Sequence, residues 1–330
     1  MARRADGQSD AQSDAQSLLR ASWPSGLLAL LLAAALAACG GGSSAPGSAS
    51  VTPPDTLQQE PGAPAMTGNT AVDGANWINY RRQQVGLAAL ADNSKIDAAA
   101  QGHSNYLRTN NAVTHVQTPG LPGFTGAALG ERLAAAGYTV LRPFAYGEVI
   151  SATSSTSGFY QAEELIAAIY HRFVMFEPLF REIGTGAAST SAGYTYFTAD
   201  MATSNGYGSS VGPGKVVVYP FNNQTHVPVN FFSDTESPDP VPGQNEVGYP
   251  VSVHADITST LVVLSFTIQP RGASALTVRQ LNNAGDGNPQ PSAAAIIPLT
   301  VLAAGTIYDV SFSGTVDGVA VNRSWSFTTK

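Results

Sequence analysis

The 330-residue sequence predicts an α+β domain followed by an all-β domain. Residues 73–205 alternate helical patterns with short strand-like runs, which is typical of an α+β sandwich and not of a parallel doubly wound sheet. From residue 215 to residue 330 no helical period is convincing, and about seven strand-length runs lie between turn residues, the pattern of a β-sandwich. With 43% hydrophobic and 12% charged residues, the composition is that of a globular protein.

The first 38 residues have the features of a bacterial signal peptide. An apolar run of roughly 12 residues follows Arg20, and this length suits a signal-peptide core better than a membrane-spanning helix. The run ends in Leu-Ala-Ala-Cys at residues 36–39, which resembles a bacterial lipobox, in which the cysteine sulfur receives a diacylglyceryl group. We therefore expect a lipoprotein of the cell envelope that Cys39 anchors to a lipid membrane, facing the periplasm or the cell exterior. The alternative is an ordinary secretory signal with an incidental cysteine.

Two linkers separate the predicted domains from each other and from the anchor. Residues 39–72 are rich in Gly, Ser, Pro, Ala and Thr and predict a flexible tether. Residues 206–214 predict a second linker, so that the two domains cover residues 73–205 and 215–330. Cys39 is the only cysteine, so lipidation leaves no thiol for a disulfide and stability must come from buried apolar area.

Helical patterns recur four times in the first domain. One helix is predicted from Asp73, as the cap, to Gly86, and a second from Ser94, with Asp97 as its capping-box partner. His103 lies on the apolar stripe of this second helix and is interpreted as a hydrogen-bonded packing residue. A third helix is predicted over residues 130–138 and a fourth, continuous one over residues 161–173. Short strands are expected at residues 138–151, 182–189 and 193–201.

Charge and motifs exclude two classes of function. The formal net charge is −7 and the sequence has no run of Lys or Arg, so electrostatic capture of nucleic acid is not expected. No glycine-rich loop of the GxGxxG or Walker type is present, so a nucleotide site has no support.

Four residues of the first domain are candidates for chemistry: His115, Glu148, His171 and Glu182. Each lies next to a glycine-bearing turn or at a helix end, where side chains can converge on a cavity. Two histidines and a carboxylate could bind zinc or another divalent metal and leave one position open for water. The sequence has no HExxH and no closely spaced pair of Cys or His ligands, so the metal assignment rests on these residue types alone.

Residues 73–205 also resemble a known family. The segments NYRRQQVGLAAL, AAQGHSNYL, THVQTPG, ERLAAAGY, YGEVIS, HRFVMFEPLFREIGTG and YTYFTADM occur in this order. Their order and character are similar to those of bacterial members of the CAP superfamily, named after cysteine-rich secretory proteins, antigen 5 and pathogenesis-related 1 proteins. The resemblance implies an α-β-α sandwich with a large central cleft, lined in many members by two histidines and two glutamates.

The resemblance assigns the four candidates to the cleft one by one. His115 is similar to the first cleft histidine, Glu148 to the glutamate of the family's GEN motif, His171 to the second histidine, and Glu182 to an acidic residue that bacterial members often carry before the following strand. Val149 departs from the family because asparagine usually follows the motif glutamate, and no residue matches the second cleft glutamate of animal and plant members.

Two of these carboxylates have structural alternatives. Glu148 could instead accept backbone N–H bonds and anchor a loop. Glu182 could pair with Arg172 or Arg181 and hold a hairpin in place.

The second domain offers no clear site. Residues 302–316 with the C-terminal strand resemble the last strands of bacterial immunoglobulin-like modules, so an immunoglobulin-like sandwich is expected. The loop before residue 247 collects several carboxylates but lacks the ligand spacing of a calcium site, so we interpret it as a solvated loop. His226 and His254 are expected on the surface. The loop carboxylates are Asp234, Glu236, Asp239 and Glu246.

Three functions follow as hypotheses. The first is a non-catalytic envelope protein whose cleft binds a metal ion, a small apolar ligand or a protein partner. The second is a metal-dependent hydrolase of envelope peptides, with His115 and His171 as ligands and Glu148 as base. The third is an adhesin that works through the β-sandwich. The sequence has no Ser or Cys placed beside a base, so the first is preferred and enzymatic activity is not expected.

Overall fold

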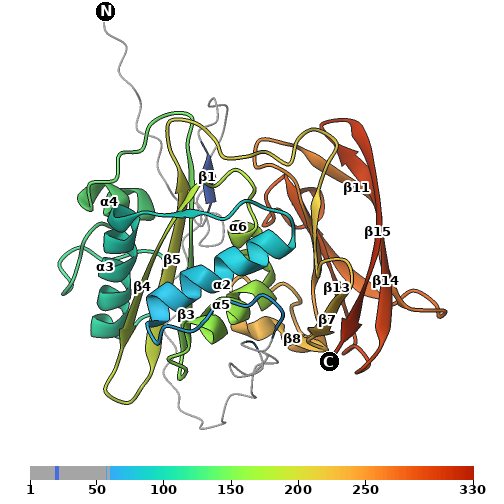
Figure 1. The fold of residues 1–330 in the computed structure, drawn as a ribbon, viewed down its shortest axis with the longest axis horizontal. Helices are drawn as coiled ribbons and strands as arrows, with labels where there is room; N and C mark the ends of the chain where they lie inside the picture. Colours follow the sequence, from blue (N-terminus) through green and yellow to red (C-terminus); the bar gives the residue numbers. More distant parts are fainter. Residues whose placement is uncertain (1–18, 22–56, 58–59) are drawn as a thin grey trace, which may run out of the picture.

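The structure, a computed structural model, describes residues 19–21, 57 and 60–330 (Figure 1). Cys39 and the predicted signal peptide, apart from residues 19–21, lie outside the described residues. In the part of the chain that is described, no helix is both long and apolar enough to cross a membrane.

The first domain supplies four strands of a five-stranded sheet whose strand order is β1-β3-β5-β4-β2, and β1 comes from the predicted signal peptide. Neighbouring strands are antiparallel except for β2 and β4, which are parallel. The strands are β1 (Leu19–Ala21), β2 (Ala91–Asp92), β3 (Ala145–Thr153), β4 (Glu182–Ser189) and β5 (Thr195–Thr203).

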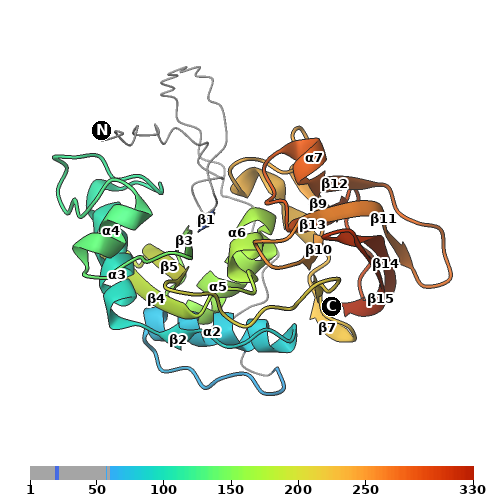
Figure 2. The same cartoon turned by 90° about the horizontal axis from the view of Figure 1, so that it is seen from above.

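Helices cover both faces of this sheet, which gives the predicted α-β-α arrangement (Figures 1 and 2). On one face lie α3 (Ser94–Asn110) and α4 (Leu129–Ala135). On the other face lie α2 (Thr70–Gln84), α5 (Gly158–Ala167) and α6 (Ile169–Met175). The apolar residues that face the second group form the larger core, with Trp77, Phe159 and Phe197 fully buried in it.

Two glycines of β4 allow α3 to lie directly on the sheet. A Cβ atom on Gly184 would stand 2.2 Å from the backbone nitrogen of Asp97, and one on Gly186 would stand 2.3 Å from that of Gln101. Ser104 uses this close approach to donate a hydrogen bond to the carbonyl oxygen of Gly186 at 3.0 Å. The glycines of the IGTG segment therefore set the distance between helix and sheet.

The predicted helix starts needed correction in two places. Asn69, not Asp73, caps α2, and its side chain accepts from the backbone nitrogens of residues 71 and 72. Asp73 is buried and accepts from the backbone nitrogens of Thr67 and Gly68. Asp97 does not close a capping box; it accepts from the backbone nitrogen of Thr185 on β4.

The continuous helix predicted over residues 161–173 is wrong. Ala168 has an extended backbone with ψ of 121° and divides the segment into α5 and α6. The apolar periodicity continues through the break, so the sequence pattern does not reveal it.

The second domain is a β-sandwich, as predicted. Its two four-stranded sheets have the orders β12-β13-β10-β6 and β11-β14-β15-β7, and β8 pairs with β9 beside them. The immunoglobulin-like assignment remains a prediction. The elements are β6 (Val217–Tyr219), β7 (Gln224–Val227), β8 (Asn230–Phe232), the 3₁₀ turn η2 (Ser233–Thr235), β9 (Glu246–Gly248), β10 (Val251–His254), β11 (Leu261–Pro270), β12 (Val278–Asn282), α7 (Asn283–Asp286), β13 (Ala293–Pro298), β14 (Ile307–Val316) and β15 (Val319–Thr329).

The two domains share a buried interface. Arg172 on α6 reaches into the β-sandwich, where its Nη1 donates to the carbonyl oxygen of Pro250 at 2.7 Å and its guanidinium stacks over Tyr219 and Tyr249. His254 is buried against Phe173 of α6, which corrects its predicted surface position, whereas His226 is exposed as predicted. The second domain is therefore packed on the first and is not a separate module.

Both predicted linkers partly belong to the folded body. Within residues 39–72, Glu60 forms a salt bridge of 2.6 Å with Arg81 of α2. Within residues 206–214, the backbone nitrogen of Gly208 donates to Leu179 at 2.8 Å and that of Val211 to Asp256 at 2.9 Å. The composition of these segments is typical of flexible linkers, but the salt bridge and the hydrogen bonds above hold parts of them against the folded domains.

Candidate functional site

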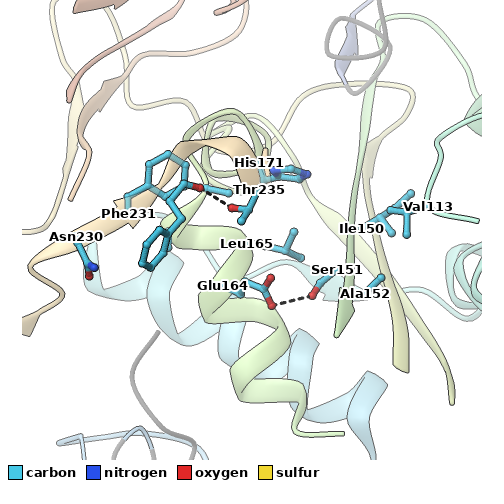
Figure 3. Close-up of a pocket in the computed structure, with 13 residues that line it drawn as sticks. Val113, Ile150, Ser151, Ala152, Glu164, Leu165, His171, Asn230, Phe231 and Thr235 are labelled. Carbon is cyan, nitrogen blue, oxygen red and sulfur yellow. Dashed lines mark hydrogen bonds between the residues drawn. The ribbon is translucent and has the colours of Figure 1, made fainter. Parts of the chain in front are cut away.

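A pocket of about 280 Å³ lies where the open edge of β3 and the α5–α6 hairpin meet the β-sandwich (Figure 3). The first domain supplies the floor and one wall, and β8 with η2 supplies the opposite wall. Figure 3 shows Val113 and Ile150 on one side and Phe231 and Asn230 on the other. The lining residues are Val113, Ile150, Ser151, Ala152, Glu164, Leu165, Ala167, Ala168, His171, Asn230, Phe231, Phe232 and Thr235.

Glu164 is the carboxylate among the residues that line this pocket. Ser151 on β3 donates to its Oε2 at 3.2 Å, and Ser151 also donates to the side-chain oxygen of Gln161. Burial raises the pKa of Glu164 to about 7, although the Ser151 hydrogen bond and the neighbouring His171 lower it. Glu164 therefore exchanges a proton near neutral pH.

His171 enters the pocket from the first turn of α6 and is held by the second domain. Its Nδ1 lies 2.9 Å from Oε1 of Glu236, the residue that follows η2. The same carboxylate accepts from the backbone nitrogens of Ile169 at 2.8 Å, Tyr170 at 2.7 Å and His171 at 3.1 Å. Glu236 thus caps α6 from the other domain, where the partial positive charge of the helix N-terminus favours a carboxylate.

This contact corrects the interpretation of the loop around Glu236 as solvated. Only 3% of Glu236 is exposed, whereas its neighbour Asp234 is exposed. Four hydrogen bonds offset the cost of burying this carboxylate.

His115 and Glu148 meet on the opposite face of the sheet. Nδ1 of His115 lies 2.8 Å from Oε1 of Glu148, and Arg132 of α4 donates to Oε2 at 2.6 Å. Burial alone would raise the pKa of Glu148, but the Arg132 guanidinium beside it and the hydrogen bond with His115 outweigh burial and hold this pKa well below its usual range. Glu148 is therefore an ionised, paired carboxylate and a weak base.

Two further titratable groups surround Glu148. His103 is fully buried, as predicted for a packing residue, and hydrogen-bonds to the carbonyl oxygen of Thr114 and to the side chain of Gln117, each at 2.9 Å. Burial lowers the pKa of His103 to about 4, so this ring is neutral. Asp200 lies opposite Glu148 in the β3–β5 register, and burial together with Glu148 raises its pKa.

Glu182 is remote from these groups. It begins β4 next to the edge strand β2, where it accepts from Asn93 and from the hydroxyl of Tyr138, each at 2.6 Å. Among the described residues Glu182 forms no ion pair with Arg172 or Arg181, and Asn93 and Tyr138 are its partners instead. Glu182 therefore fixes the sheet edge to α3 and to the segment after α4.

The four predicted site residues thus do not form one cluster. His115 and His171 each bind a different carboxylate, Glu148 on one face of the sheet and Glu236 at the domain boundary. Among the described residues, no three His, Cys, Asp or Glu side chains are grouped so that they could hold a metal ion. The donor set does not form a three-ligand centre, so we derive no chemistry through zinc, and the metal assignment remains a prediction.

Sequence reasoning missed two residues that line the pocket, Ser151 and Glu164, and Glu236, which holds His171 beside it. Ser151 and Glu164 lie in segments that the sequence assigned correctly to a strand and a helix, but no motif marks them. Glu236 contacts α6 across 65 residues or more of sequence, and no local signal carries such a contact.

These features define a class: an α-β-α domain packed on a β-sandwich, with a pocket at their junction. Residues 75–201 match the family model for CAP, the cysteine-rich secretory protein family. This part of the chain is a CAP domain, which confirms the resemblance seen in the sequence. No curated protein matches the chain.

The solved structures that are similar to the chain include three bacterial proteins. An extracellular protein with an SCP domain from Bacillus anthracis has 21% identity over 46% of this chain and 43% of its own, with a TM-score of 0.35. An outer surface protein from Borrelia burgdorferi has 14% identity over 40% of this chain and 90% of its own, with a TM-score of 0.33. A cysteine-rich secretory protein from Staphylococcus aureus has 16% identity over 42% of this chain and 40% of its own, with a TM-score of 0.31. The matched region spans less than half the length of the first and third proteins.

Proposed function

We propose that this protein is a lipid-anchored protein of the bacterial cell envelope that binds a small, largely apolar ligand without catalysis, at the junction of its two domains. The observation that carries the proposal is the pocket walled by both domains. Its lining is mostly apolar, with a few polar groups that converge on its interior, which is the usual make-up of a small-molecule site. The envelope location rests on the signal-like segment and Cys39.

The environment of the polar groups favours binding over hydrolysis. Ser151 donates its hydroxyl to Gln161 and Glu164, so it does not lie against a histidine base that would activate it. Glu148, the base of the alternative hydrolase, is paired with Arg132 and has a lowered pKa, which makes it a poor proton acceptor. The adhesin alternative needs a β-sandwich that works alone, whereas Arg172 and Glu236 tie this sandwich to the CAP domain.

The test is to fill the pocket and to measure binding of a neutral apolar fluorophore. Ala152 lines the pocket on the β3 edge, so Ala152→Trp places an indole in the cavity, while Ala134→Trp adds the same group to an exposed position of α4. We expect N-phenyl-1-naphthylamine to bind the full-length protein with saturable, one-to-one stoichiometry. Binding should be lost in Ala152→Trp and kept in Ala134→Trp. Equal binding by the two variants would place the fluorophore elsewhere and refute the proposal.

A further inference from the structure

We propose that the pocket selects amphipathic cations: small molecules with one amine or ammonium group that pairs with Glu164, and a short apolar body that lies against Val113, Ile150, Leu165 and Phe231. This inference rests on the proposed function and names the chemical class of its ligand. The argument comes from the charges around the pocket and from the distribution of its polar groups.

The lining contains a carboxylate without a cationic partner. None of the lining residues is a lysine or an arginine, and the single basic side chain is His171, whose Nδ1 is taken by Glu236. Ser151, which hydrogen-bonds to Glu164, is neutral. A largely buried carboxylate with no cation beside it is stabilised most by a ligand that carries a positive charge.

Two arginines on helices packed around Glu164 are committed elsewhere. Arg172 donates to the carbonyl oxygens of Ile166 and Pro250 and stacks on Tyr219. Arg81 is bound to Glu60 and Glu163. Neither guanidinium is available to neutralise Glu164.

Other titratable groups near Glu164 do not supply a positive charge. Burial, followed by Glu164 itself, raises the pKa of Tyr160. Burial also raises the pKa of Tyr194, with smaller effects of Tyr196 and Glu164. Both phenols are therefore neutral at physiological pH. Glu236 accepts three backbone N–H bonds at the start of α6, so the helix N-terminus compensates its charge and Glu164 is left as the uncompensated group.

The raised pKa of Glu164 agrees with this geometry and implies that the affinity for a cationic ligand depends on pH. Burial raises the pKa of Glu164 to about 7, so the ionised fraction increases about tenfold between pH 6 and pH 8. A cation binds the ionised form, so its affinity should increase about tenfold over the same range. A neutral ligand of the same length should show no such change.

The experiment compares three ligands that share one apolar chain. Octylamine, 1-octanol and octanoate are titrated into the full-length protein by calorimetry at pH 8, below their micellar concentrations. We expect octylamine to bind at least about tenfold more tightly than octanol, and octanoate to bind most weakly, because like charges repel in a low-dielectric pocket. Glu164→Gln should remove the preference for octylamine and leave the affinity for octanol within about twofold.

A matched control separates the pocket carboxylate from general surface charge. Asp234→Asn removes one negative charge from an exposed side chain beside the pocket, and we expect it to change the affinity for octylamine by less than about twofold. If octanol binds as tightly as octylamine, or if Glu164→Gln keeps the preference, this inference is wrong while the proposed function stands. If no octyl compound binds, the proposed function fails as well.

Discussion

Buried charge on Arg132 and Glu148 holds the loop after α3 to the sheet. Arg132 donates to Glu148 at 2.6 Å and to the carbonyl oxygen of His115 at 2.9 Å, and both charged side chains are almost fully buried. A buried ion pair adds little net stability compared with apolar residues, but removal of one partner leaves the other charge unpaired in a low-dielectric interior. The His115 loop therefore depends on this pair.

Arg132→Met tests this dependence. We expect a loss of about 3 to 5 kcal/mol in the free energy of unfolding, because Glu148 stays buried without its cation. Urea unfolding followed by circular dichroism measures the loss. Arg108→Met, an exposed position on α3, should cost less than about 0.5 kcal/mol. The double variant Arg132→Met/Glu148→Met should regain part of the stability, and a double variant as unstable as Arg132→Met would contradict the ion-pair explanation.

Glu177 makes the free energy of unfolding depend on pH. Its Oε1 accepts from the backbone nitrogens of Leu179 at 2.9 Å and, across the domain boundary, of Ile257 at 3.1 Å. Burial raises its pKa to about 8. The folded state therefore binds this proton more tightly than the unfolded state, so the contribution of Glu177 to stability is lost as pH rises from the unfolded value of about 4.5 to about 8.

Glu164, whose pKa burial raises to about 7, titrates in the same range from pH 6.5 to pH 8, so a variant of Glu177 is needed to separate the two effects. His103 and His254, whose pKa values burial lowers to about 4 and about 3, change stability mainly below pH 6.5, and their contribution is the same in variant and parent. From pH 6.5 to pH 8 we expect Glu177 to account for a loss of about 1.5 kcal/mol. Chemical denaturation of Glu177→Gln at both pH values should show a correspondingly smaller loss, because glutamine keeps the acceptor but does not titrate. Identical pH dependence in variant and parent would contradict the assignment.

At the scale of single elements, close contact between α3 and β4 depends on glycine. Gly184→Ala would place a Cβ atom 2.2 Å from a backbone nitrogen of α3, so the helix would have to move. We expect a loss of more than about 2 kcal/mol, measured by thermal or urea unfolding. Gly102→Ala is the control: it lies within α3, and its Cβ would meet Thr125 at an ordinary 3.5 Å. It should be neutral or stabilising by up to about 1 kcal/mol, and an equal cost in both variants would refute the steric argument.

Most elements could be predicted from local patterns. Strands β4 and β5 were expected within a few residues of their ends, because alternating apolar residues between glycines specify a strand locally. The break at Ala168 could not be predicted in this way. The residues on both sides of it are apolar and face the interior, and the compensating acceptor for the new helix N-terminus, Glu236, lies in the other domain.

The candidate site could be predicted only in part, because some of its contacts join residues of different domains. The contact between His115 and Glu148 joins two residues that the sequence had assigned to one cleft. The partner of His171 is a residue that sequence reasoning had placed in solvent, and Glu164 carries no motif. Contacts between the two domains form the pocket, and local sequence patterns do not predict such contacts.

The proposed function combines a lipid anchor at Cys39 with a binding site between the two domains. Cys39→Ser removes the thiol that lipidation requires, so the variant should move from the membrane fraction to the soluble fraction when cells expressing the full-length protein are fractionated. A change of Ser43 to Ala in the same segment should leave the protein in the membrane fraction. Equal fractionation of both variants would contradict the lipid anchor.

Glu236 joins the second domain to α6 beside the pocket, so its removal tests whether both domains build the binding site. The decisive measurement is a titration of N-phenyl-1-naphthylamine into the full-length Glu236→Ala variant, with Asp234→Ala, in the same loop but exposed, as the control. We expect Glu236→Ala to weaken binding at least about tenfold, because α6 loses its cap and His171 its partner, while Asp234→Ala binds as the parent does. Unchanged affinity in Glu236→Ala would contradict a site that both domains build.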